Sequence, residues 1–211
     1  SFMNFLLGIV LIVIMYSGAE AFRAPIIDDF LDGCAYNSAD AFQAGDEFYS
    51  IDGNRIYLIS DVSMFLERGN GVYDIVMLRD GQKVEFNDMK LVPTIESEQG
   101  LKYGFVWGIE RATLGVKLEY VWNTAKEFSR LVWLGLGDLI HGAVGVDEMA
   151  GPVGIVDMMN DVGSSAASTA DAVYSMLYFS AFIAINLAIM NMLPIPALDG
   201  GRVFFMIVTV I

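Results

Sequence analysis

The side chains best suited to chemistry lie near the end of the sequence, where a long apolar run closes. The run from Ala172 to Leu198 carries no charged side chain and exceeds the ~20 residues that a helix needs to cross a bilayer. Asp199 follows this run directly. An ionisable group at membrane depth costs roughly 2–3 kcal/mol or more, so its presence there predicts a function. A carboxylate offers oxygen donors that suit a divalent metal.

Two prolines control the backbone just before this carboxylate. Pro194 and Pro196 donate no backbone hydrogen bond, and each pushes the preceding residue to an extended conformation. We therefore expect a helix that ends near Asn191 and an extended chain that runs to about Ala197. Irregular backbone in a membrane is tolerated only where protein or a water-filled cavity covers it. Such an extended segment could pair with a second strand by β-addition.

The pattern Asn-x-x-Pro-x-Pro-x-Leu-Asp-Gly, from Asn191 to Gly200, resembles a signature of the site-2 protease family of intramembrane zinc metalloproteases. The match is similar to the bacterial regulator of sigma-E protease branch. The resemblance implies that Asp199 is a zinc ligand and that an extended segment beside it holds the substrate helix unwound. The positions that we assign to substrate binding are Asn191, Pro194, Pro196 and Leu198.

Structural explanations for the same residues stay open. Asn191 could be a helix-terminal side chain that satisfies carbonyls freed by the prolines, and Asp199 could cap the next helix. Gly200 lets the backbone turn closely before the next apolar run. Asn186 lies about 140° away from Asn191 around a helix, so we expect it to support helix packing instead.

The remaining parts of the family's metal site are missing from this sequence. The resemblance implies two histidine ligands and a general-base glutamate in a His-Glu-x-x-His motif, but the sequence has one histidine, His141. We expect His141 in a loop or interface, because it lacks a partner at helical spacing. Both ends of the sequence lie inside apolar runs, and the opening is similar to the family's second transmembrane helix. We therefore predict a fragment whose general base lies upstream of Ser1; the alternative is a pseudoprotease.

Composition favours a membrane protein and argues against a nucleic-acid partner. Hydrophobic residues make up 55% of the sequence, and its mean hydropathy is positive. The formal net charge is −14, which would repel nucleic acid. Cys34 is the single cysteine, so no intrachain disulfide can form.

Charges and turn residues replace the apolar pattern after residue 26, which predicts a small α+β domain. The segment from Ala44 to Ile56 has the pattern Ala-Gly-Asp-x-x-x-x-Ile-Asp-Gly-x-x-Ile and resembles bacterial PDZ domains. The expected elements are a short helix at 38–43, a strand at 47–51, a turn at 52–54, a helix at 61–68 capped by Ser60, and a hairpin of strands 73–78 and 83–86. Such a domain could bind extended peptides, filter bulky substrates or act as a spacer.

An amphipathic helix is expected after this domain. Its predicted apolar stripe comprises Leu114, Leu118, Val121, Ala125, Phe128, Val132, Leu136 and Leu139, with Glu119, Asn123, Glu127 and Arg130 on the other face. Trp107, Trp122 and Trp133 suit a membrane headgroup boundary. A soluble helix packed on the PDZ-like domain is the alternative.

These segments predict an α-helical polytopic membrane protein with an inserted α+β PDZ-like domain. The expected order is a transmembrane helix at 1–22, the PDZ-like domain at 26–93, amphipathic interfacial helices at 101–141, a connector with a Gly-Pro segment at 142–171, a transmembrane helix with a broken, extended end at 172–198, and the start of a further transmembrane helix at 200–211.

Charge placement orients this protein in the cell (inner) membrane. All but one of the 26 acidic and all but one of the 12 basic side chains lie between residues 19 and 171. This acidic loop is expected outside the cytoplasm, while Arg202 weakly favours the cytoplasmic side for the Asp199 turn.

The family resemblance implies substrates that are single-span membrane proteins, such as an anti-sigma factor. Two other functions stay open. A non-catalytic membrane adaptor would bind extracytoplasmic peptides through the PDZ-like domain. A channel or transporter subunit would explain a broken helix with a carboxylate, but not the inserted domain.

Overall fold

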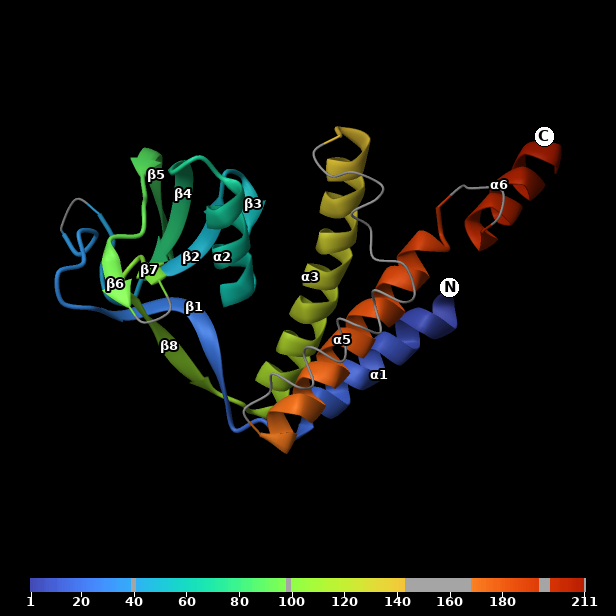
Figure 1. The fold of residues 1–211 in the computed structure, drawn as a ribbon, viewed down its shortest axis with the longest axis horizontal. Coiled ribbons are helices and arrows are strands. Elements are labelled where there is room, and N and C mark those ends of the chain that lie inside the picture. Colours follow the sequence, from blue (N-terminus) through green and yellow to red (C-terminus); the bar gives the residue numbers. More distant parts are fainter. Residues whose placement is uncertain (39–40, 98–99, 143–167, 194–197, 211) are drawn as a thin grey trace. The chain divides into compact units, whose positions relative to one another are not determined.

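The computed structural model describes residues 1–38, 41–97, 100–142, 168–193 and 198–210, and the chain divides into two compact units. Glu20–Thr113 forms a unit built on a β-sheet. The second unit combines Ser1–Ala19 with Leu114–Ile211 and is helical where it is described. Figure 1 shows the elements of both units along the chain.

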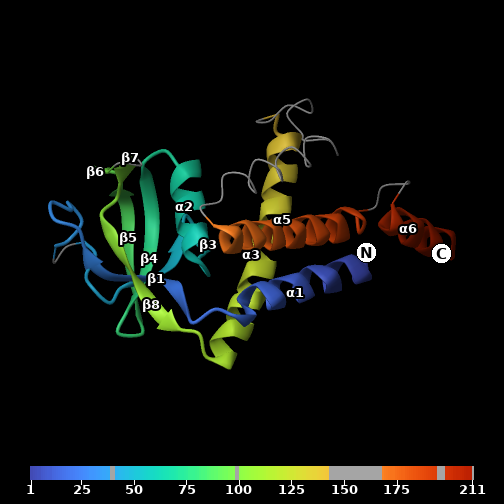
Figure 2. The same cartoon turned by 60° about the horizontal axis from the view of Figure 1, so that its bottom comes forward.

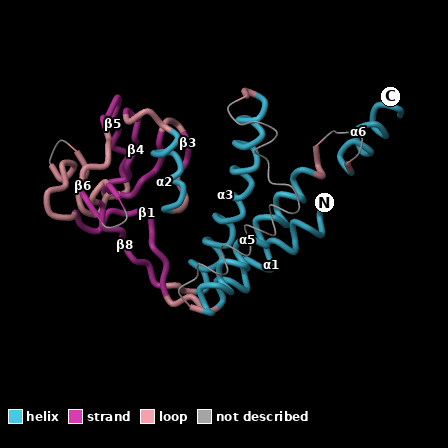
Figure 3. Tube along the Cα trace, viewed as in Figure 1, coloured by secondary structure: helices cyan, strands magenta, loops and turns pink. Residues whose placement is uncertain are grey.

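The sheet unit contains an antiparallel sheet in the order β5-β4-β2-β1-β8, with β3 paired to β2, and a separate β6-β7 pair (Figure 3). The strands are β1 (Ala21–Phe30), β2 (Glu47–Ile51), β3 (Asn54–Arg55), β4 (Val72–Arg79), β5 (Gln82–Lys90), β6 (Ile95–Ser97), β7 (Gly100–Lys102) and β8 (Phe105–Arg111). One helix, α2 (Ile59–Arg68), accompanies the sheet.

Aromatic rings from distant parts of the chain form the core of the sheet unit. Phe42 and Phe48 are fully buried, and their ring centroids lie 5.7 Å apart. Phe105 on β8 contacts both rings at 5.7 and 5.8 Å, and Trp107 packs on Phe48 at 5.8 Å. Trp107 therefore lies on β8 and packs on the core of this unit, which corrects the expectation that it belongs to the amphipathic helical segment.

The short-range predictions for the sheet unit hold where local turn chemistry decides them. The strand at Glu47–Ile51 is present as β2, and β4 and β5 form the expected hairpin around Asp80 and Gly81, which both have positive φ. The helix α2 begins at Ile59, and its first turn is capped by the Asp61 carboxylate rather than by Ser60. Asp61 accepts hydrogen bonds from the backbone N–H groups of residues 57 and 58 at 2.8 and 3.1 Å.

Two boundaries differ from the expected ones. Residues 105–111 form β8 along β1, so the sheet unit extends to Thr113 and the helical segment begins at Leu114 rather than at residue 101. The expected helix at 38–43 is absent from residues 36–38 and 41–43. There, an isolated bridge joins Asn37 to Phe42.

The Tyr103 phenol gives the sheet unit a predicted pH dependence. Burial raises its pKa to about 12, and the nearby Tyr73 phenol adds to this shift. The unfolded chain ionises near pH 10, so the folded state retains the proton longer and stability falls as the pH rises from about 10 to 12. We expect denaturant titrations at pH 9 to 11.5 to show a shallower loss for Tyr103→Phe. Parallel curves for variant and wild type would contradict this assignment.

The helical unit contains α1 (Phe2–Ser17), α3 (Leu114–Ile140), α5 (Thr169–Met190) and α6 (Asp199–Val210). Helices α1 and α5 lie side by side, and α3 crosses them (Figures 1 and 2). Among the described segments, α5 is the one helix long and apolar enough to cross a membrane. Helix α1 is apolar but has 16 residues, and residues 21–22 of the predicted span belong to β1 instead.

The face that α3 buries differs from the predicted stripe. Val121, Ala125, Phe128 and Val132 are buried as expected, but Asn123 and Glu127 are also buried, with exposed fractions of 7% and 5%. Leu114 is 76% exposed, and Leu118 is exposed as well. The reason is that α3 packs through its middle, where Thr124 Oγ1 hydrogen-bonds to Tyr16 Oη at 2.9 Å. Trp122 and Trp133 are exposed, and the headgroup-boundary placement predicted for them stays a prediction.

Gly8 allows α1 and α5 to approach closely. A Cβ atom at this position would lie 2.5 Å from Ile185 Cγ1 and 3.3 Å from Ala181 O. Small residues permit such contacts between membrane helices. We expect Gly8→Val to destabilise the helical unit by about 1–3 kcal/mol, measured as unfolding in detergent micelles. Gly18→Val is the matched control, because no atom lies within 4 Å of its Cβ position. Equal losses in both variants would contradict the packing role of Gly8.

Candidate metal and substrate site

Helix α5 ends where the prolines predict. Asn191 is its C-cap, and the backbone N–H of Asn191 donates to Leu187 O at 3.1 Å. The next two residues continue with tighter bonds, from Met192 N to Ile189 O and from Leu193 N to Met190 O. Such tightening is typical of a last helical turn. Pro194 and Pro196, with the predicted extended segment, lie outside the described residues.

The chain returns to the end of α5 when α6 begins. The backbone N–H of Gly200 donates to Asn191 O at 2.8 Å. Asp199 is the first residue of α6, and Leu198 before it is half-buried. The hydrogen bond therefore brings two of the predicted site residues, Asn191 and Asp199, to one place in the fold.

A third helix end reaches the same place. Ser1, just before α1, donates from its hydroxyl to Asp199 Oδ2 at 3.1 Å. The Asp199 side chain is nevertheless 60% exposed. Its place in the first turn of α6 suits a negative charge, because a helix N-terminus carries partial positive charge.

Among the described residues, the predicted zinc ligand Asp199 lies apart from any cluster of metal-binding side chains. No group of three or more His, Cys, Asp or Glu side chains in the described part of the chain could hold a metal ion. His141 lies just beyond α3, where its Nδ1 is 2.7 Å from Gly137 O. The chemistry of the Asp199 carboxylate suits zinc, and its role as a ligand stays a prediction.

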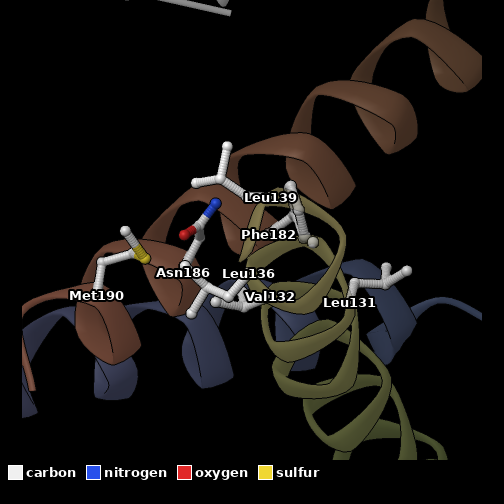
Figure 4. A pocket seen from close by; sticks show the side chains of 8 residues that line it. Leu131, Val132, Leu136, Leu139, Phe182, Asn186 and Met190 are labelled. Atoms are coloured by element: carbon white, nitrogen blue, oxygen red, sulfur yellow. The ribbon is translucent and has the colours of Figure 1, made fainter. Parts of the chain in front are cut away.

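A pocket of about 290 Å³ lies between α3 and α5 (Figure 4). Its lining is apolar except for the Asn186 side chain. Asn186, which we expected to support helix packing, lies between these helices and lines the pocket, five residues before Asn191. The sequence signal was present, since an amide in an apolar run requires a partner or a role. The lining residues are Leu131, Val132, Gly135, Leu136, Leu139, Phe182, Asn186 and Met190.

Comparison with known proteins assigns this arrangement to a class. The model of peptidase family M50 matches residues 1–211. A zinc metalloprotease, RasP, of Bacillus licheniformis is 30% identical over 99% of this chain and 48% of its own length. The regulator of sigma-W protease RasP of Bacillus subtilis is 28% identical, again over 99% and 48%. A putative zinc metalloprotease of Clostridium perfringens is 29% identical over 100% of this chain and 61% of its own length.

The chain belongs to peptidase family M50, the family of the site-2 proteases. It spans about half the length of the Bacillus relatives that it matches. Members of this family are membrane proteins, and the relatives' names identify zinc as their metal. The prediction of the family from the signature at residues 191–200 is therefore confirmed.

Proposed function

We propose that this chain is part of an intramembrane zinc metalloprotease that cleaves transmembrane segments of single-span membrane proteins. Regulated intramembrane proteolysis of an anti-sigma factor is one such reaction. The protein would cross the cell (inner) membrane several times, contact the lipid bilayer directly, and hold its PDZ-like unit outside the cytoplasm. The observation that carries the proposal is the hydrogen bond from Gly200 N to Asn191 O, which brings Asn191 and Asp199 near each other where α5 ends and α6 begins.

Each residue at this place has a defined task in the proposal. Asp199 would hold zinc, which when bound would supply a more acidic water and polarise the scissile carbonyl. The Asn191 amide binds the substrate backbone or a developing oxyanion. Pro194, Pro196 and Leu198 hold the substrate extended, because a helix hides its own peptide bonds. The general base that the family resemblance implies would take the proton.

The test is the zinc content of the full-length protein. We expect the purified wild type to retain zinc through dialysis and Asp199→Asn to lose it, because the amide is a weaker ligand without charge. Asp171 also lies in the first turn of a membrane helix, so Asp171→Asn is the matched control. This variant should retain zinc. If Asp199→Asn retains all of its zinc, the assignment of Asp199 as a zinc ligand is wrong.

A peptide-binding adaptor is the second candidate function, and one observation favours it. Among the described strands, β5 and β8 lie at the two edges of the sheet. An open edge offers backbone groups for strand addition by an extended peptide. The adaptor predicts that Asp199→Asn has no effect on function, whereas the protease predicts a loss. The same variant therefore separates the two candidates.

A further inference from the structure

The second residue of α6 packs directly on the backbone that follows α5. A Cβ atom at Gly200 would overlap the carbonyl group of Met192 and lie 2.5 Å from Leu193 O. Both neighbours are main-chain atoms, so no side-chain rotation relieves the overlap. At Gly8, in contrast, the nearest atom belongs to the Ile185 side chain. Any side chain at Gly200 must therefore move one backbone segment away from the other.

The same glycine makes the one described hydrogen bond between the backbones of α6 and Asn191. Its N–H donates to Asn191 O at 2.8 Å. Displacing Gly200 by even an ångström would stretch this bond beyond the usual 2.7–3.2 Å range for N–H···O. Asp199 precedes Gly200 and would move with it, while Asn191 stays on α5. The position of Gly200 thus sets how the two functional side chains are placed relative to each other.

We propose that Gly200 is a positioning residue that seats the start of α6 on the Met192–Leu193 peptide group and so fixes Asp199 relative to Asn191. The inference rests on the proposed function for its chemical consequence, but its geometric part is independent of zinc. Gly200 is needed because a side chain would not fit at this position, and not because the backbone adopts a conformation that favours glycine. Alanine is normally a better helix residue than glycine, so a loss on substitution would have to come from the displaced contact.

The experiment compares Gly200→Ala with Gly137→Ala in the full-length protein. Gly137 is the matched control, since it also lies in a helix and has no atom within 4 Å of its Cβ position. The first readout is hydrogen exchange in a peptide that covers residues 191–202, measured in detergent. The second is zinc retained after dialysis, and the third is cleavage of a single-span membrane substrate.

We expect Gly200→Ala to exchange faster than wild type across residues 191–202 and to lose at least half of its zinc. Cleavage should fall by about 100-fold, the order expected when a catalytic group moves by ~1 Å. Gly137→Ala should match the wild type in all three readouts. Wild-type exchange, zinc content and cleavage in Gly200→Ala would overturn the proposal.

The test of the positioning role of Gly200 can fail or succeed independently of the test of the proposed protease function. If Asp199→Asn loses zinc while Gly200→Ala behaves as wild type, the protease proposal stands and the positioning role fails. If the wild type binds no zinc and cleaves no substrate, the protease proposal fails, yet faster exchange in Gly200→Ala alone still supports the positioning role. A general collapse of the fold in Gly200→Ala would appear as faster exchange in α1 and α3 as well, and would overturn the local role.

Discussion

Cleavage by the full-length protein is expected to fall by more than about 100-fold when Asp199 is replaced by Asn. Removing a partner that merely orients a metal ligand typically costs about 10–100-fold, so loss of a ligand should cost more. The substitution keeps the size of the side chain and its place in the first turn of α6. The measurement is cleavage of a single-span substrate by protein reconstituted in lipid vesicles, with membrane insertion checked on the same samples.

A helix-capping role for Asp199 is the explanation to exclude. A carboxylate in the first turn of a helix contributes about 0.3–1 kcal/mol through the helix dipole, with or without a metal. Asp171 occupies this position in α5, where Ser168 Oγ donates to its Oδ2 at 2.7 Å. Asp171→Asn should therefore reproduce the capping loss and leave cleavage within about twofold of wild type. Equal activity in the two variants would reduce Asp199 to a cap.

The parts of the site that follow from local rules could be predicted from the sequence. Proline chemistry alone locates the end of α5, because Pro194 and Pro196 cannot continue a helix. The structure places the helix C-cap at Asn191, in agreement with this rule. The glycine after Asp199 indicated a close turn, but not which peptide group it would approach. That contact depends on how α6 folds back on α5.

Features that depend on tertiary contacts could not be predicted from periodicity. The stripe on α3 suggested that Asn123 and Glu127 face away from the core, yet both are buried. Helical spacing gives the relative directions of side chains, not the length of helix that a neighbour covers. Similarly, β8 reads as part of an amphipathic connector until its pairing with β1 is known, because strand partners distant in sequence leave no local signal.

An ion pair inside the sheet unit also depends on tertiary contacts and could not be predicted from the sequence. Asp46 and Arg79 are 33 positions apart, and nothing in their local sequence links them. Asp46 is fully buried, and Arg79 donates to it from Nε at 2.8 Å and from Nη2 at 2.7 Å. Asp46 Oδ2 also accepts from Gln43 N at 2.8 Å, and Arg79 Nη2 donates to Ala41 O at 3.0 Å. This pair therefore ties the loop before β2 to the end of β4.

Replacing Asp46 by Ala is expected to destabilise the sheet unit by about 3 kcal/mol. Breaking a buried ion pair from one side typically costs about 3–5 kcal/mol, and the Arg79 side chain keeps 24% exposure, which favours the lower end. The carboxylate also raises the pKa of Arg79, chiefly by accepting its hydrogen bonds. Denaturant unfolding followed by tryptophan fluorescence measures the change, since Trp107 packs on the core ring of Phe48.

The control and the double variant decide whether the loss comes from the pair itself. Asp80→Asn should change stability by less than about 0.5 kcal/mol, because Asp80 is an exposed turn residue and Asn tolerates its positive φ. Asp46→Ala combined with Arg79→Ala should cost less than the sum of the single changes, because the second change removes the charge that the first leaves unpaired. Strict additivity would mean that Asp46 acts through the Gln43 N–H bond alone. In that case the loop before β2 would be held by its own turn, and its link to β4 would contribute little to the stability of the unit.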